Sequence, residues 1–406
     1  MTPADQRLIT PRFVLVVAVG LAYFLSIGML LPVIPLFVKN ELRGGNLAVG
    51  LAVGAFAVGA VLLRPFAGRI GDRFGRRVLI VGGALVVAAS AALYLFAHGM
   101  AVLVLVRIVG GVGEAAFFVG AGTMITDLAP EERRGEAISY WSVAVYGGLA
   151  FGPTLGETLL GTDRFTSVWV VAAGLALGAA MLGLLTTETG RPRSPPAPGT
   201  PRPPLLNRAA LAPGAVLFLG LVGLAGFVSF VPLYVSQIGM ADSRGVFLLY
   251  GCLILAVRIF GARLPDRLGS VRAGTAATGL AAAGLLIMAA FATPIGLFAG
   301  TAVFSIGMSL LYPSLLTLAL TGVPETERAS AVGTVSSFFD ASQGLGALIL
   351  GGVAAVAGYR GAFVGGAVLA VGGMVMLRTG IGARAQGPVD PVAAAAARES
   401  LEPDPP

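Results

Sequence analysis

The sequence predicts an all-α membrane protein with twelve transmembrane helices arranged in two pseudo-symmetric halves of six. Three observations predict this fold: the composition, the spacing of the apolar runs and an internal repeat. Of 406 residues, 56% are hydrophobic and only 12% are charged, whereas soluble domains are about half apolar and a quarter charged. This composition excludes an ordinary soluble enzyme, a nucleic-acid module and a disordered chain.

The apolar runs are long enough to cross a bilayer, which takes about 20 residues per helix. We expect spans at about 13–37, 47–66, 78–97, 101–125, 137–159, 167–186, 211–236, 245–262, 273–292, 296–320, 330–356 and 361–377. The first run resembles a signal peptide but lacks a small-residue cleavage site, so we interpret it as an uncleaved helix.

The basic residues predict the orientation. With twelve spans, 21 of the 27 lysines and arginines, Arg64 and Arg258 included, fall at the side of the termini, and five fall at the other side. This bias predicts that both termini are cytoplasmic. It also explains the net charge of +7 without nucleic acid as a partner.

Two segments repeat at one offset of 194 residues. RPFAGRIGDRFG at 64–75 aligns with RIFGARLPDRLG at 258–269, and PEERRGEA at 130–137 aligns with PETERASA at 324–331. Parallel repeats of this kind place a substrate path between the halves, near the bilayer midplane. The predicted organisation is an N-terminal half (1–186), a cytoplasmic Pro/Arg-rich linker (187–209), a C-terminal half (210–378) and a disordered cytoplasmic tail (379–406).

The loop after the second span has a specific pattern, GRIGDRFGRR at 68–77. It resembles the signature loop of the major facilitator superfamily (MFS). The matching positions are Gly68, Asp72, Arg73, Gly75, Arg76 and Arg77. LVLVRIVGGVGEAA at 103–116 resembles the superfamily's fourth-helix motif. GGLAFGPTLGE at 147–157 is similar to the Gly-Pro motif of its antiporter branches, which usually have Gly-Gly in place of Gly156-Glu157.

The resemblance implies the MFS fold and a gate at the cytoplasmic side. Asp72 would lie near the start of span eleven, around Ser330, where a helix N-terminus favours a carboxylate. Arg76 would then pair with Asp127 at the end of span four. The alternative is that these charges only fix the topology.

Three ionisable residues lie far from the ends of their spans: Arg107, Glu114 and Asp340. A charge at such a position costs about 2.5–3.5 kcal/mol on insertion scales. Arg107 and Glu114 are two turns apart on one face and could be a neutralised structural pair. Asp340 could be an acid that hydrogen bonds keep neutral. The functional interpretation makes Glu114 and Asp340 proton carriers, with Arg107 beside them and Glu157 as a weaker candidate.

Polar residues at helical spacing are candidates for the substrate cavity, although an interhelical hydrogen bond is an equal alternative for each. The candidates are Tyr23, Ser26, Ser142, Tyr146, Gln237, Ser305, Ser309, Tyr312, Ser336 and Gln343. The G-x-G-x-x-A pattern at 111–116 is no dinucleotide site, because it lies inside a continuous apolar run rather than between a strand and a helix.

The sequence therefore predicts a secondary active transporter of the cytoplasmic (inner) membrane that works by alternating access. The resemblance to the antiporter branches implies proton-coupled efflux, and the mostly apolar cavity favours hydrophobic or amphiphilic small molecules as substrates. The alternatives are proton-symport uptake of a sugar or organic acid and, more remotely, a membrane sensor or enzyme. We expect a monomer with small molecules, protons and the lipid bilayer as partners, no nucleic acid, no cofactor, no metal and no catalytic residue.

Overall fold

A computed structural model describes residues 8–130, 133–161, 164–189, 206–260, 268–324 and 327–381, and within these ranges the chain is helical without strands. Residues 190–205 of the predicted linker and 382–406 of the predicted tail lie outside the described residues. The helices are α1 (Pro11–Asn40), α2 (Asn46–Phe74), α3 (Arg76–Leu93), α4 (Met100–Leu128), α5 (Arg134–Leu160), α6 (Phe165–Leu184), α7 (Arg208–Gln237), α8 (Arg244–Phe260), α10 (Ser270–Ala290), α11 (Pro294–Leu320) and α12 (Arg328–Met376), with the short turns η2 (Tyr94–Phe96) and η5 (Leu377–Ile381).

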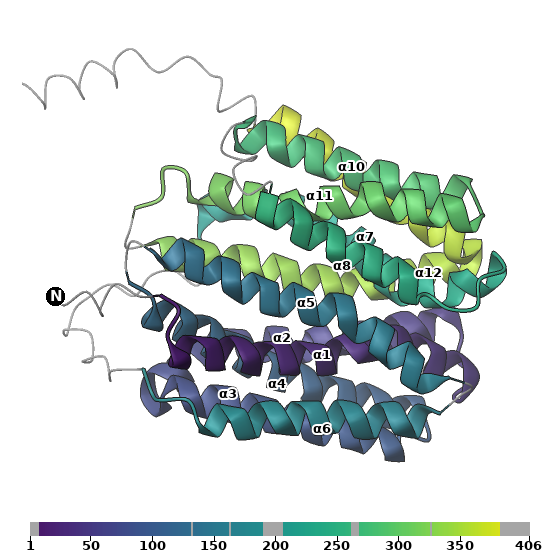
Figure 1. The fold of residues 1–406 in the computed structure, drawn as a ribbon. Coiled ribbons are helices and arrows are strands. Elements are labelled where there is room, and N and C mark those ends of the chain that lie inside the picture. Colours follow the sequence, from purple (N-terminus) through teal and green to yellow (C-terminus); the bar gives the residue numbers. More distant parts are fainter. Residues whose placement is uncertain are drawn as a thin grey trace, which may run out of the picture.

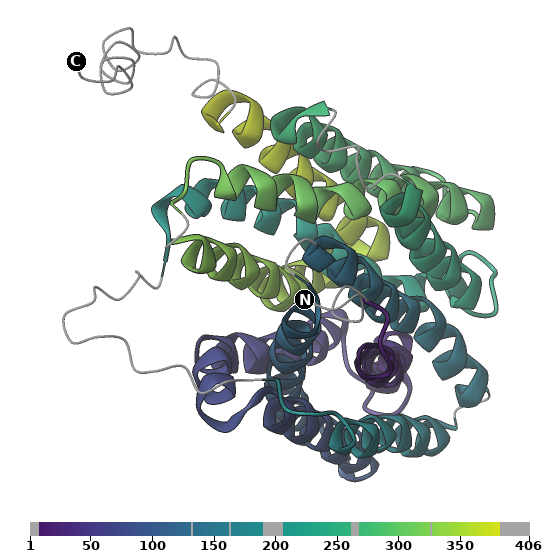
Figure 2. The ribbon, with the colours of Figure 1, turned by 60° about the vertical axis from the view of Figure 1, so that its left-hand side comes forward.

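The helices form two bundles that lie side by side (Figures 1 and 2). In the first, α1 packs on α5 and α6, and α4 packs on α2 and α3. In the second, α12 packs on α7 and α10, and α10 also packs on α11. We call the end of the molecule that carries the α2–α3 connection the α2–α3 end, and the opposite end the α1–α2 end.

α12 contains two spans rather than one. At Gly358 the backbone leaves the helical region, with φ 69° and ψ −174°, a conformation that favours glycine because it has no Cβ. Gly358 lies between the last two predicted spans, 330–356 and 361–377. In the described part of the chain, nine helices, with α12 taken as one, are long and apolar enough to cross a membrane. Counting α12 as two and adding α5 and α8 gives the twelve predicted helices.

Glycines let the helices within a half approach closely. A Cβ on Gly28 of α1 would lie 2.5 Å from the carbonyl oxygen of Gly148 on α5, and one on Gly152 would lie 2.6 Å from the Cα of Gly28. The GGLAFGPTLGE segment of α5 therefore packs against α1, in the manner of small-residue crossings in membranes.

The two halves meet through α2 and α12, through α5 and α8, and through α1 and α7. The first two contacts are related by the repeat. Ala57 of α2 faces Gly344 of α12, and Gly251 of α8 faces Ala150 of α5. Ala57 and Gly251 are 194 residues apart, as are Ala150 and Gly344. The repeat in the sequence thus becomes two equivalent crossings between the halves.

Buried apolar side chains join the halves at the α1–α2 end. One cluster runs from Phe37 and Trp169 of the first half into the second half, where it includes Phe227 and Phe304. A separate cluster, which includes Phe117, belongs to the first half at the α2–α3 end. The hydrophobic core is therefore continuous between the halves at the α1–α2 end.

Candidate functional site

An ion pair joins the two halves in the middle of the molecule. Arg64 of α2 lies with its Nε 2.6 Å from Oδ2 of Asp340 on α12. The Nη2 atom of the same guanidinium lies 3.8 Å from Oε2 of Glu114 on α4. The side chains of Arg64, Glu114 and Asp340 are only 17%, 14% and 6% exposed. We call these three residues the central triad.

The central triad holds one cation between two carboxylates. Two unit charges 4 Å apart interact by about 4 kcal/mol at an effective dielectric constant of 20, so Arg64 stabilises either carboxylate strongly. With both carboxylates ionised, the triad carries a net charge of −1 in a place where burial disfavours charge. Binding one proton makes the triad neutral, and Arg64 remains protonated throughout.

Arg64 does not lie where the sequence analysis expected it. Its charge was assigned to the end of a span, but it lies ten residues before α2 ends at Phe74. The apolar run ends earlier than the helix, because the last turns of α2, around Asp72, are polar but still helical. The internal repeat could have indicated that Arg64 belongs to the site, since Arg64 and Arg258 share the offset of 194.

The repeat-related pair lies between α8 and α5. Arg258 donates a hydrogen bond from Nη2 to the hydroxyl of Tyr146 at 2.8 Å, and its guanidinium carbon lies 4.3 Å from the centre of the Tyr146 ring. Tyr146 and Asp340 are also 194 residues apart. The two arginines therefore contact equivalent positions of the opposite half, one an acid and the other a tyrosine.

Other candidates from the sequence lie near the triad. Tyr312 of α11 is 3.4 Å from Ser336 of α12 through their hydroxyls, and its ring packs edge-on against Phe339. Tyr312 is close enough to Arg64 and Asp340 to interact electrostatically with both. Gln343 is half-buried on α12 and donates to the hydroxyl of Ser342 at 3.4 Å.

Tyr23 is fully buried on the Glu114 side of the triad. Its ring stacks on Phe117 with 3.6 Å between the centroids, and its hydroxyl has no hydrogen-bond partner in the described structure. The hydroxyl interacts electrostatically with Glu114. Tyr23 is therefore a buried donor close to the triad rather than an exposed wall of a cavity.

Five of the cavity candidates are placed elsewhere. Three serines are buried and donate to backbone carbonyls: Ser26 to Ala172, Ser305 to Thr301 and Ser309 to Ile306. Only the bond of Ser26 joins two helices, as the alternative interpretation expected, whereas Ser305 and Ser309 bond within α11. Ser142 donates to the carbonyl of Ile138 one turn earlier, and Gln237 is exposed at the end of α7.

Arg107 does not pair with Glu114. Its Nε donates to the carbonyl of Ala52 at 2.9 Å and its Nη2 to that of Val53 at 3.3 Å, both on α2. Its guanidinium carbon also lies 4.5 Å from the ring centre of Phe56. Arg107 therefore links α4 to α2, and in the described structure the cation beside Glu114 is Arg64.

At the α1–α2 end, Glu157 connects the halves. Its carboxylate accepts hydrogen bonds from the backbone N–H of Ser243 at 2.9 Å and from the Ser243 hydroxyl at 2.5 Å. Ser243 directly precedes α8, which begins at Arg244. Glu157 is 8% exposed, so a buried carboxylate of the first half holds the N-terminus of a helix of the second.

At the α2–α3 end, Arg76 lies between two carboxylates. Its Nη1 atom is 2.8 Å from Oδ1 of Asp72, and its Nε atom is 3.6 Å from Oδ2 of Asp127. Thr189 also donates to Asp127 at 3.1 Å. The guanidinium of Arg73 stacks on Phe74, and a Cβ on Gly68 would meet only open space.

Glu188, also at this end, was not among the residues predicted from the sequence. Its carboxylate accepts from the backbone N–H groups of Arg76 at 2.8 Å and Arg77 at 3.0 Å, at the start of α3. Gly75, with φ 100°, precedes them, and a Cβ there would collide with Glu188. Glu188 thus places a carboxylate at the N-terminus of α3, while the expected position of Asp72 near Ser330 stays a prediction. In the sequence, the only indication of a role for Glu188 was its position directly after the apolar run of α6.

We predict that Glu188→Gln lowers the stability of the purified protein. The amide loses the charge that interacts with the N-terminus of α3, which is worth about 0.3–1 kcal/mol at an exposed site. Thermal unfolding in detergent should show a melting temperature lower by a few degrees. Glu136→Gln, which removes an exposed carboxylate paired with Arg133, should change it less, and equal effects would contradict the assignment.

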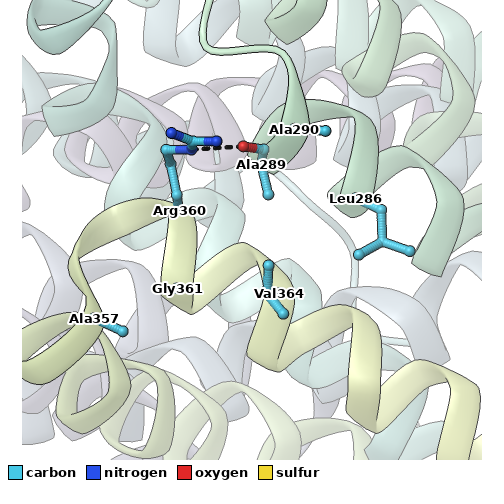
Figure 3. A pocket seen from close by; sticks show the side chains of 7 residues that line it. All are labelled: Leu286, Ala289, Ala290, Ala357, Arg360, Gly361 and Val364. Carbon is cyan, nitrogen blue, oxygen red and sulfur yellow. Dashed lines mark hydrogen bonds between the residues drawn. The ribbon is translucent and has the colours of Figure 1, made fainter.

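A shallow cleft of about 530 Å³ lies far from the triad, between α10 and the second part of α12. Figure 3 shows Arg360 at its rim, where Nε donates to the carbonyl of Ala289 at 2.6 Å. The rest of the lining is apolar, with Leu286 and Val364 on its walls. Among the described residues, no group of three His, Cys, Asp or Glu side chains could hold a metal ion.

The fold matches solved transporter structures over most of its length. The bacterial homolog of the human lysosomal transporter Spinster, in an inward-facing and unoccupied conformation, aligns with a TM-score of 0.75 and 16% identity over 93% of this chain and 97% of that one. A mutant of the nucleoside transporter NupG gives 0.76 and 12% identity over 90% and 99%. The human organic anion transporter MFSD10 gives 0.69 and 20% identity over 91% and 100%.

Sequence comparisons identify the family. An uncharacterized MFS-type transporter of Salmonella typhimurium is 31% identical over 369 residues, which cover 87% of this chain and 92% of that protein. A similarly described protein of Burkholderia mallei is 28% identical over 387 residues, covering 92% and 93%. The family model matches residues 16–321 and 246–403. The chain is thus a transport protein rather than an enzyme, and it belongs to the Major Facilitator Superfamily.

Proposed function

We propose that this transporter exports hydrophobic or amphiphilic small molecules in exchange for protons, by alternating access. Its substrate path runs between the two halves, and Glu114 and Asp340 carry the proton. The observation that supports the proposal is the central triad, in which Arg64 contacts an acid of its own half at 3.8 Å and an acid of the other half at 2.6 Å.

The triad can couple protonation to a conformational change because its stronger ion pair crosses between the halves. Protonation of Asp340 removes the charge that attracts Arg64 to α12, which weakens the contact between the halves. Arg64 can then interact with Glu114 alone, inside its own half. A group whose two protonation states favour different conformations supplies the differential free energy that a conformational shift requires.

The proposal places the α2–α3 end in the cytoplasm of a bacterial cell and the protein in the inner membrane. Without Arg64 and Arg258, which lie inside the bundle, the bias in basic residues is still 19 to 5 and supports this orientation. Both termini and the linker would then be cytoplasmic. A reporter fused at Arg398 and another inserted in the linker should both give a cytoplasmic signal, and an external signal at either would contradict the topology.

The groups around the triad support an amphiphilic substrate. Tyr146, Tyr312 and Phe339 are half-buried and offer aromatic faces, while the polar groups among them are few. A sugar site would require many hydrogen-bonding groups that converge on one place, and the described residues near the triad offer few of them. We propose that the protein acts as a monomer, because each half contacts the other within one chain.

Neutral isosteres of the two acids test the proposal. We expect Asp340→Asn or Glu114→Gln to abolish gradient-driven transport while substrate exchange without a gradient persists, because the variant keeps its shape but cannot release a proton. Everted membrane vesicles, with a panel of amphiphilic compounds and with or without a proton gradient, provide the measurement. The two variants should also lose the pH dependence of transport.

The control is Glu41→Gln, which neutralises an exposed carboxylate at the α1–α2 end and should transport as the parent does. If Asp340→Asn and Glu114→Gln both still accumulate substrate against its gradient and respond to pH as the parent does, neither acid carries the proton. Proton-driven movement of substrate out of everted vesicles would instead support uptake by symport.

A further inference from the structure

Arg258 is a half-buried cation for which the described residues supply no acidic partner. Among the described residues, no carboxylate lies within ion-pair distance of it, and its Nε atom is buried without a hydrogen-bond partner. Its contacts are the hydroxyl and the ring of Tyr146. A charge within a membrane bundle normally pairs with another charge or with backbone carbonyls, so the guanidinium retains capacity to bind an anion.

The repeat shows which partner is missing. At the equivalent position in the other half, Arg64 has Asp340 at 2.6 Å. The residue that corresponds to Asp340 is Tyr146, which is neutral and supplies one hydrogen-bond acceptor. One crossing between the halves therefore contains an internal ion pair, whereas the described residues of the other crossing supply the cation without an acid.

The side chain that contacts Arg258 is aromatic, and a second tyrosine lies on the same helix. Tyr250 lies two turns earlier than Arg258 on α8 and is half-buried. Its ring packs against Phe227 at 5.2 Å and Phe304 at 6.2 Å between centroids. Phe227 and Phe304 belong to the closed core, so the aromatic face that a ligand at Arg258 would meet is that of Tyr146, which suits an apolar body attached to the charged group.

We infer that Arg258 and Tyr146 form an anion-binding subsite, and that the substrates of this transporter are amphiphilic organic anions with a carboxylate or sulfonate next to an aromatic or aliphatic body. The inference rests on the proposed function in one respect, the substrate path between the halves. The guanidinium offers planar, paired N–H donors to the anionic oxygens, and the Tyr146 ring stacks against the other face of the guanidinium.

Two probes with one scaffold test the charge requirement. 1-Anilinonaphthalene-8-sulfonate carries a sulfonate, and N-phenyl-1-naphthylamine is the same molecule without it. Equilibrium dialysis against the full-length protein in detergent gives the affinity for each, without a membrane or a gradient. We expect the parent to bind the sulfonate more tightly, and Arg258→Gln to weaken sulfonate binding at least tenfold while changing binding of the neutral probe less than twofold.

A second pair of variants keeps the test valid if Arg258→Gln folds poorly. Tyr146→Asp supplies the carboxylate that the repeat has at Asp340, so an internal ion pair should compete with the ligand and weaken sulfonate binding at least tenfold. Tyr146→Asn removes the ring without adding charge and should weaken it less. Arg272→Gln removes an exposed arginine of α10 with the same change in net charge and should bind both probes as the parent does.

A parent that prefers the neutral probe, or an Arg258→Gln variant that loses both probes equally, would overturn the inference. So would Tyr146→Asp and Tyr146→Asn variants with equal affinities for the sulfonate. Because dialysis involves no gradient, these outcomes are independent of the proton-coupling test. Selective loss of the sulfonate with normal transport in Asp340→Asn and Glu114→Gln would uphold the subsite and refute the proton carriers.

Discussion

Arg64→Gln should reduce gradient-driven transport at least a hundredfold, which corresponds to about 2.7 kcal/mol. The substitution leaves Asp340 and Glu114 buried at 6% and 14% exposure without their cation. Removing one partner of a buried pair costs about 3–5 kcal/mol, so both acids would remain protonated through the cycle. The measurement is accumulation by everted vesicles, with the amount of protein in the membrane matched to the parent.

Arg64→Lys distinguishes charge from geometry. Lysine keeps the positive charge but has one ammonium group, whereas Arg64 uses Nε toward Asp340 and Nη2 toward Glu114. We expect partial transport and a larger loss of the interaction with one acid than with the other. If Arg64→Gln transports at the parent rate at every pH, the triad has no part in coupling.

Most of the fold could be predicted from the sequence because membrane spans are local features. Each apolar run carries its own signal, and the kink at Gly358 fell between two runs because a glycine and an arginine interrupt the apolar pattern there. The extent of α2 was harder to predict. Its last turns are polar and helical, so the apolar run ended near Arg64 although the helix continues to Phe74.

The site was only partly predictable, because pairing depends on which helices are neighbours. Glu114 and Arg107 share a helix, so the sequence suggested that they pair. The crossing of α2 against both α4 and α12 instead brings Arg64 to Glu114 and Asp340 and turns Arg107 toward the carbonyls of Ala52 and Val53. Helical spacing reveals which residues share a face of one helix, but contains no information about the helix that covers that face.

Glu157→Ala should open the α1–α2 end of the molecule. The parent carboxylate accepts two hydrogen bonds from Ser243 across the halves, and a hydrogen bond to a charged group contributes about 1.5–3 kcal/mol. Since about 1.4 kcal/mol changes a population ratio tenfold, losing both bonds should raise the fraction of molecules open at this end at least tenfold. Transport should slow, because the closed state that the contact stabilises becomes rarer.

Distances between spin labels at Arg164→Cys and Ala292→Cys report this opening, because both positions are exposed, lie at the α1–α2 end and belong to different halves. The native Cys252 is replaced by serine to prevent labelling there. Ser243→Ala removes the hydroxyl bond but keeps the backbone N–H donor, so its distance distribution should fall between those of the parent and Glu157→Ala. Glu41→Gln, an exposed neutralisation at the same end, should match the parent. If Glu157→Ala also gives the parent distribution, the apolar core shared by the halves at this end closes it without the carboxylate, and Glu157 contributes only to the local capping of α8.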